Sequence, residues 1–366
     1  MKKNNNIFDI KEICTVPPPH GGCTVYVDRL IKELTKDGYK VGGYYDAQCD
    51  NKAIVHSEMF DEWKWMETSK FPFKIWKYLR ESRPYKVIHS HFSLEGMLYL
   101  WTIKTLLNKK IVVTVHNSMN SNYYRTTNPI NRFFLHRMLK SPSVTWITVS
   151  EQGKKQLESF PIVPVNPIHV IPAYIPISGP YTPLGKEMQQ YIDNHDRIIS
   201  FYGHSFMVNQ GVDIYGFEAA LKMFSSIIKK TDHKVGLVMC LAETRDKEKI
   251  SALHSLAKQL GVDNKIFWQI GAINNIRSLW HQTNIYIRPT STDGDSVAVR
   301  EVLDEGVVVV ASDVCWRPEG VVTYCYSDLN DFIEKVKANL CKEKSEPCPN
   351  YAIYNLMKSV YDNLLK

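Results

Sequence analysis

The sequence predicts an α/β protein made of two doubly wound domains, each with a parallel sheet. A chain of 366 residues is long for one domain and sufficient for two, each burying its own core. Both halves contain the order strand, glycine turn, helix and strand, which is typical of a parallel crossover unit. Pro172, Pro176 and Pro180 mark a crossing between the halves. We therefore expect one domain at residues 1–172 and a second at residues 173–349.

The first half is expected to contain strands that end in polar residues. A strand at Ile10–Val16 is followed by a glycine turn and by a helix at Thr24–Lys36, whose apolar residues recur at helical spacing. Further strands are expected at Tyr85–His91, at Lys110–His116 and, as the last of this domain, at Trp146–Ser150. The hydroxyl of Ser150 is suited to cap a helix that runs from Glu151 to Phe160.

The second half repeats this alternation of strands and helices. Strands are expected at Arg197–Gly203, Lys234–Leu241 and Asn264–Gly271, and helices at Ile250–Leu260 and Asn275–Gln282. The last segment, Tyr351–Lys366, is expected to be a helix because its apolar residues Leu356, Val360 and Leu364 fall on one face.

The most informative stretch of the chain is residues 285–313. A short apolar run is stopped by Pro289, and the loop after it contains Gly294, which is free to adopt a positive φ. Ser296 or Asp295 can cap the helix that follows, and a second strand comes after that helix. Such a loop lies at the carboxyl edge of a parallel sheet, where ligands of these folds bind.

Two acids in this stretch are eight residues apart, Asp293 in the loop and Glu301 in the expected helix. If the helix starts near Val297, Glu301 lies roughly 5–6 Å below the free N–H groups of its first turn. Those N–H groups and the helix dipole favour a phosphate. A carboxylate one turn away can accept hydrogen bonds from ribose hydroxyls, and the loop acid can reach a sugar joined to the phosphate. The arrangement suits a sugar–diphosphate–nucleoside; the alternative is a crossover helix with surface acids.

This stretch is similar to a known signature. Residues from Thr292 to Glu301 resemble the E-x7-E motif of the retaining, family-four glycosyltransferases of the GT-B fold, with Asp293 where the family usually has Glu. The segment Arg317–Gly320 fits a branch found in bacterial surface-polysaccharide gene clusters. The resemblance implies two facing Rossmann-like domains, an interdomain cleft, and a terminal helix, residues 350–366, that crosses back onto the first domain.

The resemblance also implies roles for individual residues. In the family the first acid contacts the donor sugar and the second the nucleotide ribose, which assigns Asp293 and Glu301 to the catalytic site. The strand-end histidine His116 is expected to contact the donor sugar or phosphate, with His91 as a second candidate; satisfied polar strand ends are the alternative. The other residues expected to bind substrate are Gly21 and Gly22 of the first-domain glycine loop, Gly203, His204, Gly271, Gly294, Asp295, Ser296, Val297 and Arg300.

The phosphate-binding cations of the family are the largest departure. Gln210 stands where the family has Lys, and His204 where it often has Arg. Arg288, Arg300 and Arg317 are the candidates to balance the diphosphate instead, although Arg300 is also placed to pair with an acid of its own helix.

Composition and charge restrict the location and the partners. The net charge is +7, and basic residues exceed acidic ones in the first half only, which favours an anionic surface or substrate there; a solvated basic face is the alternative. No apolar run reaches the roughly 18–20 residues of a spanning helix, and residues 1–6 lack the core of a signal peptide, so we expect a cytoplasmic protein. The eight cysteines lack metal-ligand spacing, so we expect free thiols and no metal, and no nucleic-acid motif is present.

Two first-domain segments, residues 63–80 and 122–140, mix aromatic side chains with Lys and Arg. Such segments bind anionic headgroups through their cations while Trp and Phe sit at the acyl boundary. We expect them to dock the protein at the inner face of the membrane or to bind a lipid-linked acceptor. The alternative is that the aromatics pack in the core and the lysines extend around them.

The resemblance, together with these features, implies a metal-independent, retaining transferase with no further cofactor. It is expected to move a sugar from a UDP- or GDP-sugar to a glycan or lipid-linked acceptor in surface polysaccharide biosynthesis. The fold offers no obvious protein nucleophile, so positioning and stabilisation of the departing diphosphate are expected to carry catalysis. One alternative is a non-catalytic partner subunit, favoured by the missing phosphate cations and by Asp293. The other is a sugar-nucleotide epimerase of the same fold.

Overall fold

A computed structural model describes residues 8–14, 22–46, 62–66, 73–116, 120–209, 211–242, 247–271, 273, 276–293 and 295–366. The chain divides into two compact units. The first unit runs to Ile175 and also includes Tyr351–Lys366, and the second is Pro176–Asn350. The division after Ile175 lies three residues beyond Pro172, the expected boundary.

The first unit is built on a parallel sheet. Its seven strands lie in the order β3 (Glu62–Met66), β2 (Val41–Asp46), β1 (Phe8–Ile13), β4 (Tyr85–Ser90), β5 (Lys110–Val115), β6 (Val144–Thr148) and β7 (His169–Val170). All of these pairs are parallel. The expectation that the strand at Trp146 is the last of this domain is wrong, because the two-residue strand β7 pairs with β6 beyond it.

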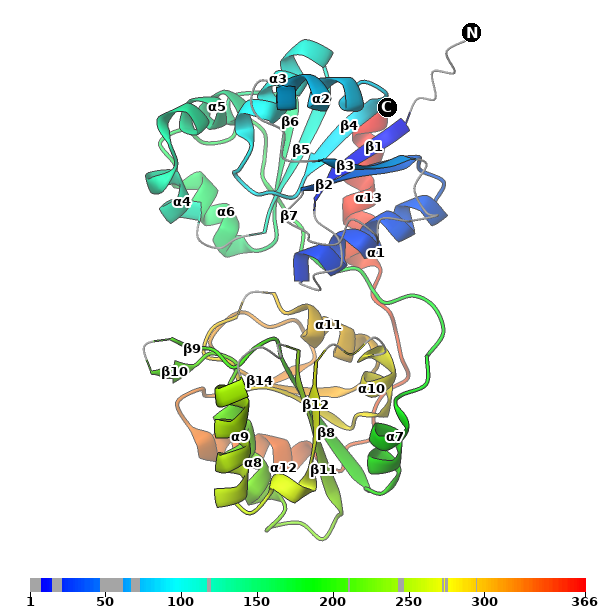
Figure 1. The fold of residues 1–366 in the computed structure, drawn as a ribbon, viewed down its shortest axis with the longest axis vertical. Coiled ribbons are helices and arrows are strands. Elements are labelled where there is room, and N and C mark those ends of the chain that lie inside the picture. Colours follow the sequence, from blue (N-terminus) through cyan, green and yellow to red (C-terminus); the bar gives the residue numbers. More distant parts are fainter. Residues whose placement is uncertain are drawn as a thin grey trace. The chain divides into compact units, whose positions relative to one another are not determined.

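Helices connect these strands. They are α1 (Gly22–Lys36), α2 (Phe73–Ser82), α3 (Met97–Leu107), α4 (Asn120–Thr126), α5 (Pro129–Leu139) and α6 (Glu151–Glu158). Ser150 caps α6 by accepting a hydrogen bond from the amide of Gly153, as expected. The C-terminal helix α13 (Ala352–Leu365) packs against β4 (Figure 1, red) and buries Met357 and Tyr361 in this unit.

The second unit is built on a parallel six-stranded sheet. Its strands lie in the order β12 (Ile266–Ile270), β11 (Val235–Leu241), β8 (Arg197–Gly203), β13 (Ile285–Arg288), β14 (Val308–Ser312) and β15 (Val321–Tyr324). Its helical segments are α7 (Lys186–Asp193), α8 (Phe217–Ile227), α9 (Lys247–Gln259), the short η1 (Asp263–Lys265), α10 (Ile276–Gln282), α11 (Val297–Asp304) and α12 (Leu329–Asn339). A small antiparallel pair, β9 (Val208–Asn209) and β10 (Val212–Asp213), follows β8.

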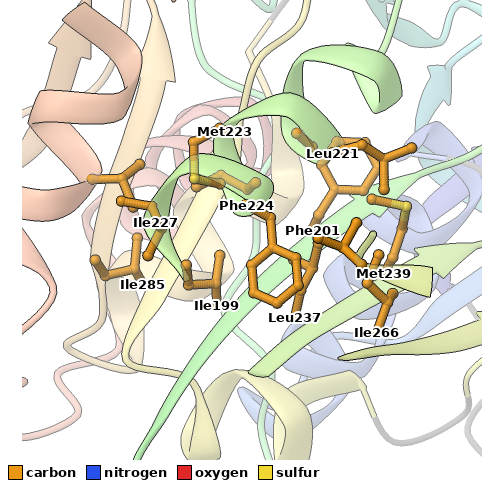
Figure 2. Close-up of a cluster of buried hydrophobic side chains, with 14 of the residues drawn as sticks. Ile199, Phe201, Leu221, Met223, Phe224, Ile227, Leu237, Met239, Ile266 and Ile285 are labelled. Carbon is orange, nitrogen blue, oxygen red and sulfur yellow. The ribbon is translucent and has the colours of Figure 1, made fainter. Parts of the chain in front are cut away.

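The sheet of the second unit has a continuous apolar core on one face. Met223, Phe224 and Ile227 of α8 lie over residues of the central strands, including Phe201 of β8 and Met239 of β11 (Figure 2). Burial of one such side chain contributes roughly 1.5–3 kcal/mol to folding. This packing fixes the central strands whose carboxyl ends carry the predicted donor loop.

Each sheet reverses its strand order once, between β1 and β4 in the first unit and between β8 and β13 in the second. Ligands of doubly wound folds bind outside the carboxyl ends of the strands at such a reversal. The predicted α/β class with two parallel-sheet domains is confirmed. Among the described residues, no helix has the length and apolar character needed to cross a membrane.

Candidate functional site

Asp293 is the centre of a buried ion-pair group after β13. Nε of Arg288 donates to its Oδ2 at 3.0 Å, and Nη2 of Arg288 to its Oδ1 at 3.2 Å. Nη1 of Arg317 donates to the same Oδ2 at 2.8 Å. Burial raises the pKa of Asp293, but the charges and hydrogen bonds of the two arginines outweigh it and lower the pKa below its ordinary value. The carboxylate is therefore charged, and it holds both guanidinium groups in place.

The same two arginines tie the loop to the sheet. Nη1 of Arg288 donates to the carbonyl oxygen of Tyr202 on β8, at 3.1 Å. Nε of Arg317 donates to the carbonyl oxygen of Ser312 on β14, at 3.0 Å, and its Nη2 reaches Thr290 Oγ1. Arg288 and Arg317, two of the three candidate phosphate cations, are thus positioned by the loop acid.

Helix α11 begins beside this group. It starts at Val297, and Ser296 is its cap, because the Ser296 hydroxyl accepts from the amide of Val299. Asp295, the other candidate cap, pairs with Nε of Arg300 through both carboxylate oxygens, at 2.7 and 2.9 Å. The first amides of a helix have no partner within the helix. The helix therefore presents its N-terminal N–H groups at the carboxyl edge of the sheet.

Glu301 lies one turn into α11 and is buried, with 6% of its surface exposed. Its Oε2 accepts a hydrogen bond from the indole Nε1 of Trp280 at 3.1 Å. At the end of α11, Glu305 accepts hydrogen bonds from Nε of Arg277 at 2.6 Å and from the Tyr181 hydroxyl at 2.8 Å. The contacts of Glu305 anchor the end of α11. The carboxylate of Glu301 lies near the beginning of the same helix.

The remaining second-domain candidates lie at the ends of neighbouring strands. Gly203 ends β8, and a Cβ there would come within 2.5 Å of the ring of Phe217, so close packing requires glycine at this position. His204 follows it and is exposed. The N–H of Gly271 donates to the carbonyl oxygen of Leu241 at 2.8 Å, which ties this residue to the neighbouring strand β11.

The other predicted residues differ in where the chain places them. Gly21, Gln210 and Gly294 lie outside the described residues. Gly22 is the first residue of α1 and is exposed. The structure therefore brings Asp293, Asp295, Ser296, Val297 and Arg300 together around the start of α11, with Gly203 at the end of the adjacent strand β8.

His116 follows β5 in the first unit and belongs to a buried polar network. Its Nε2 lies 3.0 Å from Nδ1 of His91, and Nε2 of His91 lies 2.8 Å from Oε2 of Glu12. Tyr361 of α13 donates to Oε1 of Glu12 at 2.8 Å, and its oxygen lies 2.6 Å from Nδ1 of His89. Sequence reasoning identified His116 and His91 and missed the other three. The available signal was a charged residue inside an apolar strand, because Glu12 lies within β1.

The network is charged at Glu12. Burial raises the pKa of this carboxyl, but the charge of His89 and the hydrogen bonds from His89 and His91 hold it well below its ordinary value. Potential ligand atoms of Glu12, His89 and His91 lie within 4.8 Å of one another, which is close enough for a metal ion. These atoms already have hydrogen-bond partners, since Nε2 of His91 bonds to Glu12 and Nδ1 of His89 to Tyr361. A hydrogen-bonded network therefore accounts for their positions.

Two doubly wound parallel-sheet domains, each with polar residues at its strand-order reversal, define the class of GT-B proteins. Residues 20–178 match the family described as Glycosyltransferase Family 4. This match covers most of the first unit, and the GT-B fold extends over the whole length of the chain. No curated protein has a significantly similar sequence.

Solved glycosyltransferases share the fold at low sequence identity. Sucrose-phosphate synthase from Thermosynechococcus elongatus is 15% identical, with a TM-score of 0.63, over 97% of this chain and 99% of that chain. A glycosyltransferase from Rickettsia africae is 13% identical, with a TM-score of 0.66, over 99% of both chains. The Anabaena protein HepE, in complex with UDP and glucose, is 11% identical, with a TM-score of 0.66, over 97% of this chain and 99% of that chain.

Proposed function

We propose that the protein is a retaining, metal-independent glycosyltransferase that transfers a sugar from a nucleotide-sugar donor to a glycan or lipid-linked acceptor. One observation carries the donor site: the amino end of α11 lies at the strand-order reversal of the second sheet, with Glu301 one turn behind it. The helix amides bind the diphosphate, and Glu301 accepts hydrogen bonds from the ribose hydroxyls. UDP is the favoured nucleotide, supported by HepE, whose structure is a complex with UDP and glucose.

The charges around the loop supply the missing phosphate cations. Arg288 and Arg317 share the single carboxylate of Asp293, so this trio carries one positive charge in excess. Asp295 is paired with Arg300. Because both aspartates hold arginines, these cations and the helix amides, rather than a metal ion, neutralise the departing diphosphate in the proposed mechanism. Asp293 then acts on the donor mainly by positioning the two arginines.

Donor binding provides the direct test. In Glu301→Gln we expect the affinity for UDP-sugar to fall by about 10–100-fold, because a hydrogen bond to a charged acceptor contributes roughly 1.5–3 kcal/mol. Glutamine retains a carbonyl oxygen for the Trp280 indole, so the thermal midpoint is expected to change little. Titration calorimetry with UDP-, GDP- and CMP-sugars measures both the nucleotide preference and the loss.

The matched control is Glu319→Gln, an exposed acid on the loop after β14, which is expected to leave affinity unchanged. If no nucleotide sugar binds the unaltered protein, the non-catalytic partner subunit becomes the better description. Conversion of the donor sugar without any acceptor would instead favour a sugar-nucleotide epimerase. Incorporation of labelled sugar into extracted lipid or glycan acceptors tests transfer. The anomeric configuration of the product, determined by NMR, tests retention.

The first domain has a surface suited to a membrane. Helix α3 packs between α2 and α5 (Figure 1), and apolar side chains on these helices are exposed. Trp76 of α2 is 71% exposed, and Ile130 and Phe133 of α5 are 66% and 53% exposed. On α5 the guanidinium of Arg137 lies 5.4 Å from the Phe133 ring centroid. The alternative that all these aromatics are buried in the core therefore does not hold for Trp76 and Phe133.

An apolar face bordered by cations fits the inner surface of a membrane. The proposal therefore places the protein on the cytoplasmic side of the membrane, and it assigns the protein to surface polysaccharide biosynthesis. In the double variant Ile130→Ser, Phe133→Ser we expect binding to vesicles with anionic lipid to fall by about 10-fold or more, since each buried apolar side chain contributes roughly 1.5–3 kcal/mol. Vesicle flotation measures this. Leu356→Ser, which changes an exposed leucine of α13, is the control. Equal binding of all three proteins would remove the membrane surface from the proposal.

A further inference from the structure

A tryptophan beside the donor loop is exposed. Trp316 lies in the loop that follows β14, at the carboxyl edge of the second sheet, and 67% of its surface is exposed. Tryptophan is a large side chain that is highly buried on average. Its neighbour in the same loop, Arg317, has a side chain that is only 4% exposed. The loop therefore turns one side chain inward and the preceding one outward, and the outward one is a flat aromatic ring.

The residues on both sides of Trp316 are anchored. Before it, the amide of Asp313 donates to the carbonyl oxygen of Tyr324 on β15, at 3.0 Å. After it, Arg317 donates to the carbonyl oxygen of Ser312 at 3.0 Å and to Asp293 at 2.8 Å. The ring is thus presented by a loop that is already ordered. A ligand that packs on such a preorganised surface pays little for ordering it.

One face of the ring is occupied by an arginine of the donor helix. The guanidinium carbon of Arg300, in the first turn of α11, lies over the Trp316 ring, 5.7 Å from its centroid. Arg300 is itself held by Asp295, which accepts from its Nε at 2.7 and 2.9 Å. Since the carboxylate neutralises this cation, the opposite face of the ring retains the partial negative charge of an aromatic system. That opposite face is turned to solvent.

The position along α11 indicates which part of the donor lies near this ring. In the proposed function the first amides of the helix bind the diphosphate, and Glu301, one turn behind, binds the ribose. The base is attached to the ribose, so it extends from the Glu301 side. Asp295 precedes the helix and holds the Arg300 guanidinium, so Trp316 belongs to the amino end. At that end the diphosphate is joined to the sugar that is transferred.

A sugar ring has the chemistry that fits an exposed indole face. One face of a pyranose presents several C–H bonds, which are weakly polar and carry a slight positive charge, and its hydroxyl groups lie around the rim. The C–H bonds pack against the negative face of the aromatic ring. The hydroxyls meanwhile keep their hydrogen bonds to water and to polar neighbours. A nucleobase also stacks on aromatic rings, but it belongs to the other end of the donor.

We propose that Trp316 is a stacking platform for a sugar ring at the transfer end of the donor site. This rests on the proposed function in one respect, the binding of the diphosphate at the amino end of α11. Two sugar rings meet at that end, the transferred sugar and the terminal residue of a glycan acceptor, and both offer the same C–H face. Trp316 binds and orients the ring and takes no part in breaking or forming bonds.

Titration calorimetry with matched pairs of ligands separates the sugar from the rest of the donor. The pairs are UDP with UDP-glucose and GDP with GDP-mannose. In Trp316→Ala we expect the affinity for the nucleotide sugar to fall by about 3–10-fold and that for the free nucleotide to stay within about 2-fold, the size of one aromatic contact. Trp316→Phe retains a ring and is expected to lose less than about 3-fold.

The matched control is Tyr326→Ala. Tyr326 lies on the turn after β15, at the same edge of the sheet, and is 38% exposed. Its removal is expected to change the affinity for neither member of a pair. Equal losses for the free nucleotide and the nucleotide sugar in Trp316→Ala would place a base or a phosphate on the ring and would overturn the proposal.

Transfer to extracted lipid or glycan acceptors distinguishes the two possible sugars. If the acceptor residue stacks on Trp316, donor affinity stays unchanged in Trp316→Ala and the KM for the acceptor rises by about 3–10-fold. A loss in either measurement supports the platform and identifies the ring that occupies it. No change in both measurements would contradict it.

Iodide quenching of fluorescence reports on the ring itself, without turnover. The chain has eight tryptophans, so the contribution of Trp316 is the difference between the unaltered protein and Trp316→Phe. Iodide is expected to quench this contribution in the presence of the free nucleotide and to quench it less once the nucleotide sugar or the acceptor is bound. Protection by the free nucleotide alone would count against a sugar platform.

The two proposals fail in different ways. If no nucleotide or nucleotide sugar binds the unaltered protein, the proposed function fails. If they bind and Trp316→Ala behaves like Tyr326→Ala, only the platform fails. Because Trp316 is exposed, its substitution by alanine is expected to shift the thermal midpoint by less than about 2 °C. Should Trp316→Ala not fold, the quenching comparison with Trp316→Phe decides the question.

Discussion

Replacing Asp293 by alanine is expected to lower the free energy of unfolding of the second domain by about 3–5 kcal/mol, the cost of leaving a buried charge without its partner. Arg288 and Arg317 both donate to this carboxylate, and their side chains are only 9% and 4% exposed. Removal of the acid leaves two positive charges close together in a region with little water. Urea unfolding measures the loss of stability. Hydrogen exchange, measured for each domain separately, assigns that loss to the second domain.

The pH dependence of the free energy of unfolding provides a second test of the Asp293 ion pairs. The pKa of Asp293 is lowered in the folded protein, so its stabilisation is complete above the unfolded pKa near 4 and is lost as the pH falls through the folded value. The difference between the native protein and Asp293→Ala is therefore expected to shrink below about pH 4. Glu319→Ala, at an exposed site nearby, is expected to change stability by less than about 0.5 kcal/mol. A loss below about 1 kcal/mol in Asp293→Ala would show that water, not the carboxylate, balances the arginines.

Replacing Met357 by alanine is expected to destabilise the first domain by about 2–5 kcal/mol, the range found when a large core side chain is truncated. Met357 lies on α13 and is fully buried, although it comes near the end of the chain. The loss is expected to appear in the hydrogen exchange of β4 and α13 and to leave the second domain unchanged, because α13 packs on the first unit.

The neighbouring residue supplies the control for this second prediction. Leu356 is 51% exposed on the same helix, and Leu356→Ala is expected to change stability by less than about 0.5 kcal/mol. Equal losses in the two variants, or a loss of protection confined to the second domain, would contradict the placement of α13. The comparison holds helix propensity nearly constant, since leucine and methionine differ little in a helix.

Local patterns predicted the second-domain site because its parts are close in sequence. Pro289, the polar loop, Ser296 and the apolar residues of α11 lie within one crossover unit, so strand, cap and helix were all expected where the structure has them. The partners of Asp293 were not expected. Arg317 lies 24 residues away and reaches the carboxylate only because β14 pairs with β13. The sequence did not show that these candidate phosphate cations share an acid.

The first-domain network was even less accessible to sequence reasoning. Glu12 and Tyr361 are separated by 349 residues, and only the docking of the last helix brings them together. His89 lies in β4 and His91 directly after its end, but their spacing carries no information about a carboxylate on β1. Strand pairing and helix docking are long-range properties, and the polar contacts that depend on them follow only from the folded chain.

The first domain is assembled from two segments separated by the whole of the second. A ribosome therefore releases everything needed to fold Pro176–Asn350 before it releases α13. During synthesis the domain translated first lacks its cover along β4, and it is completed only when α13 emerges. The carboxylate of Glu12 acquires its tyrosine partner only when α13 docks.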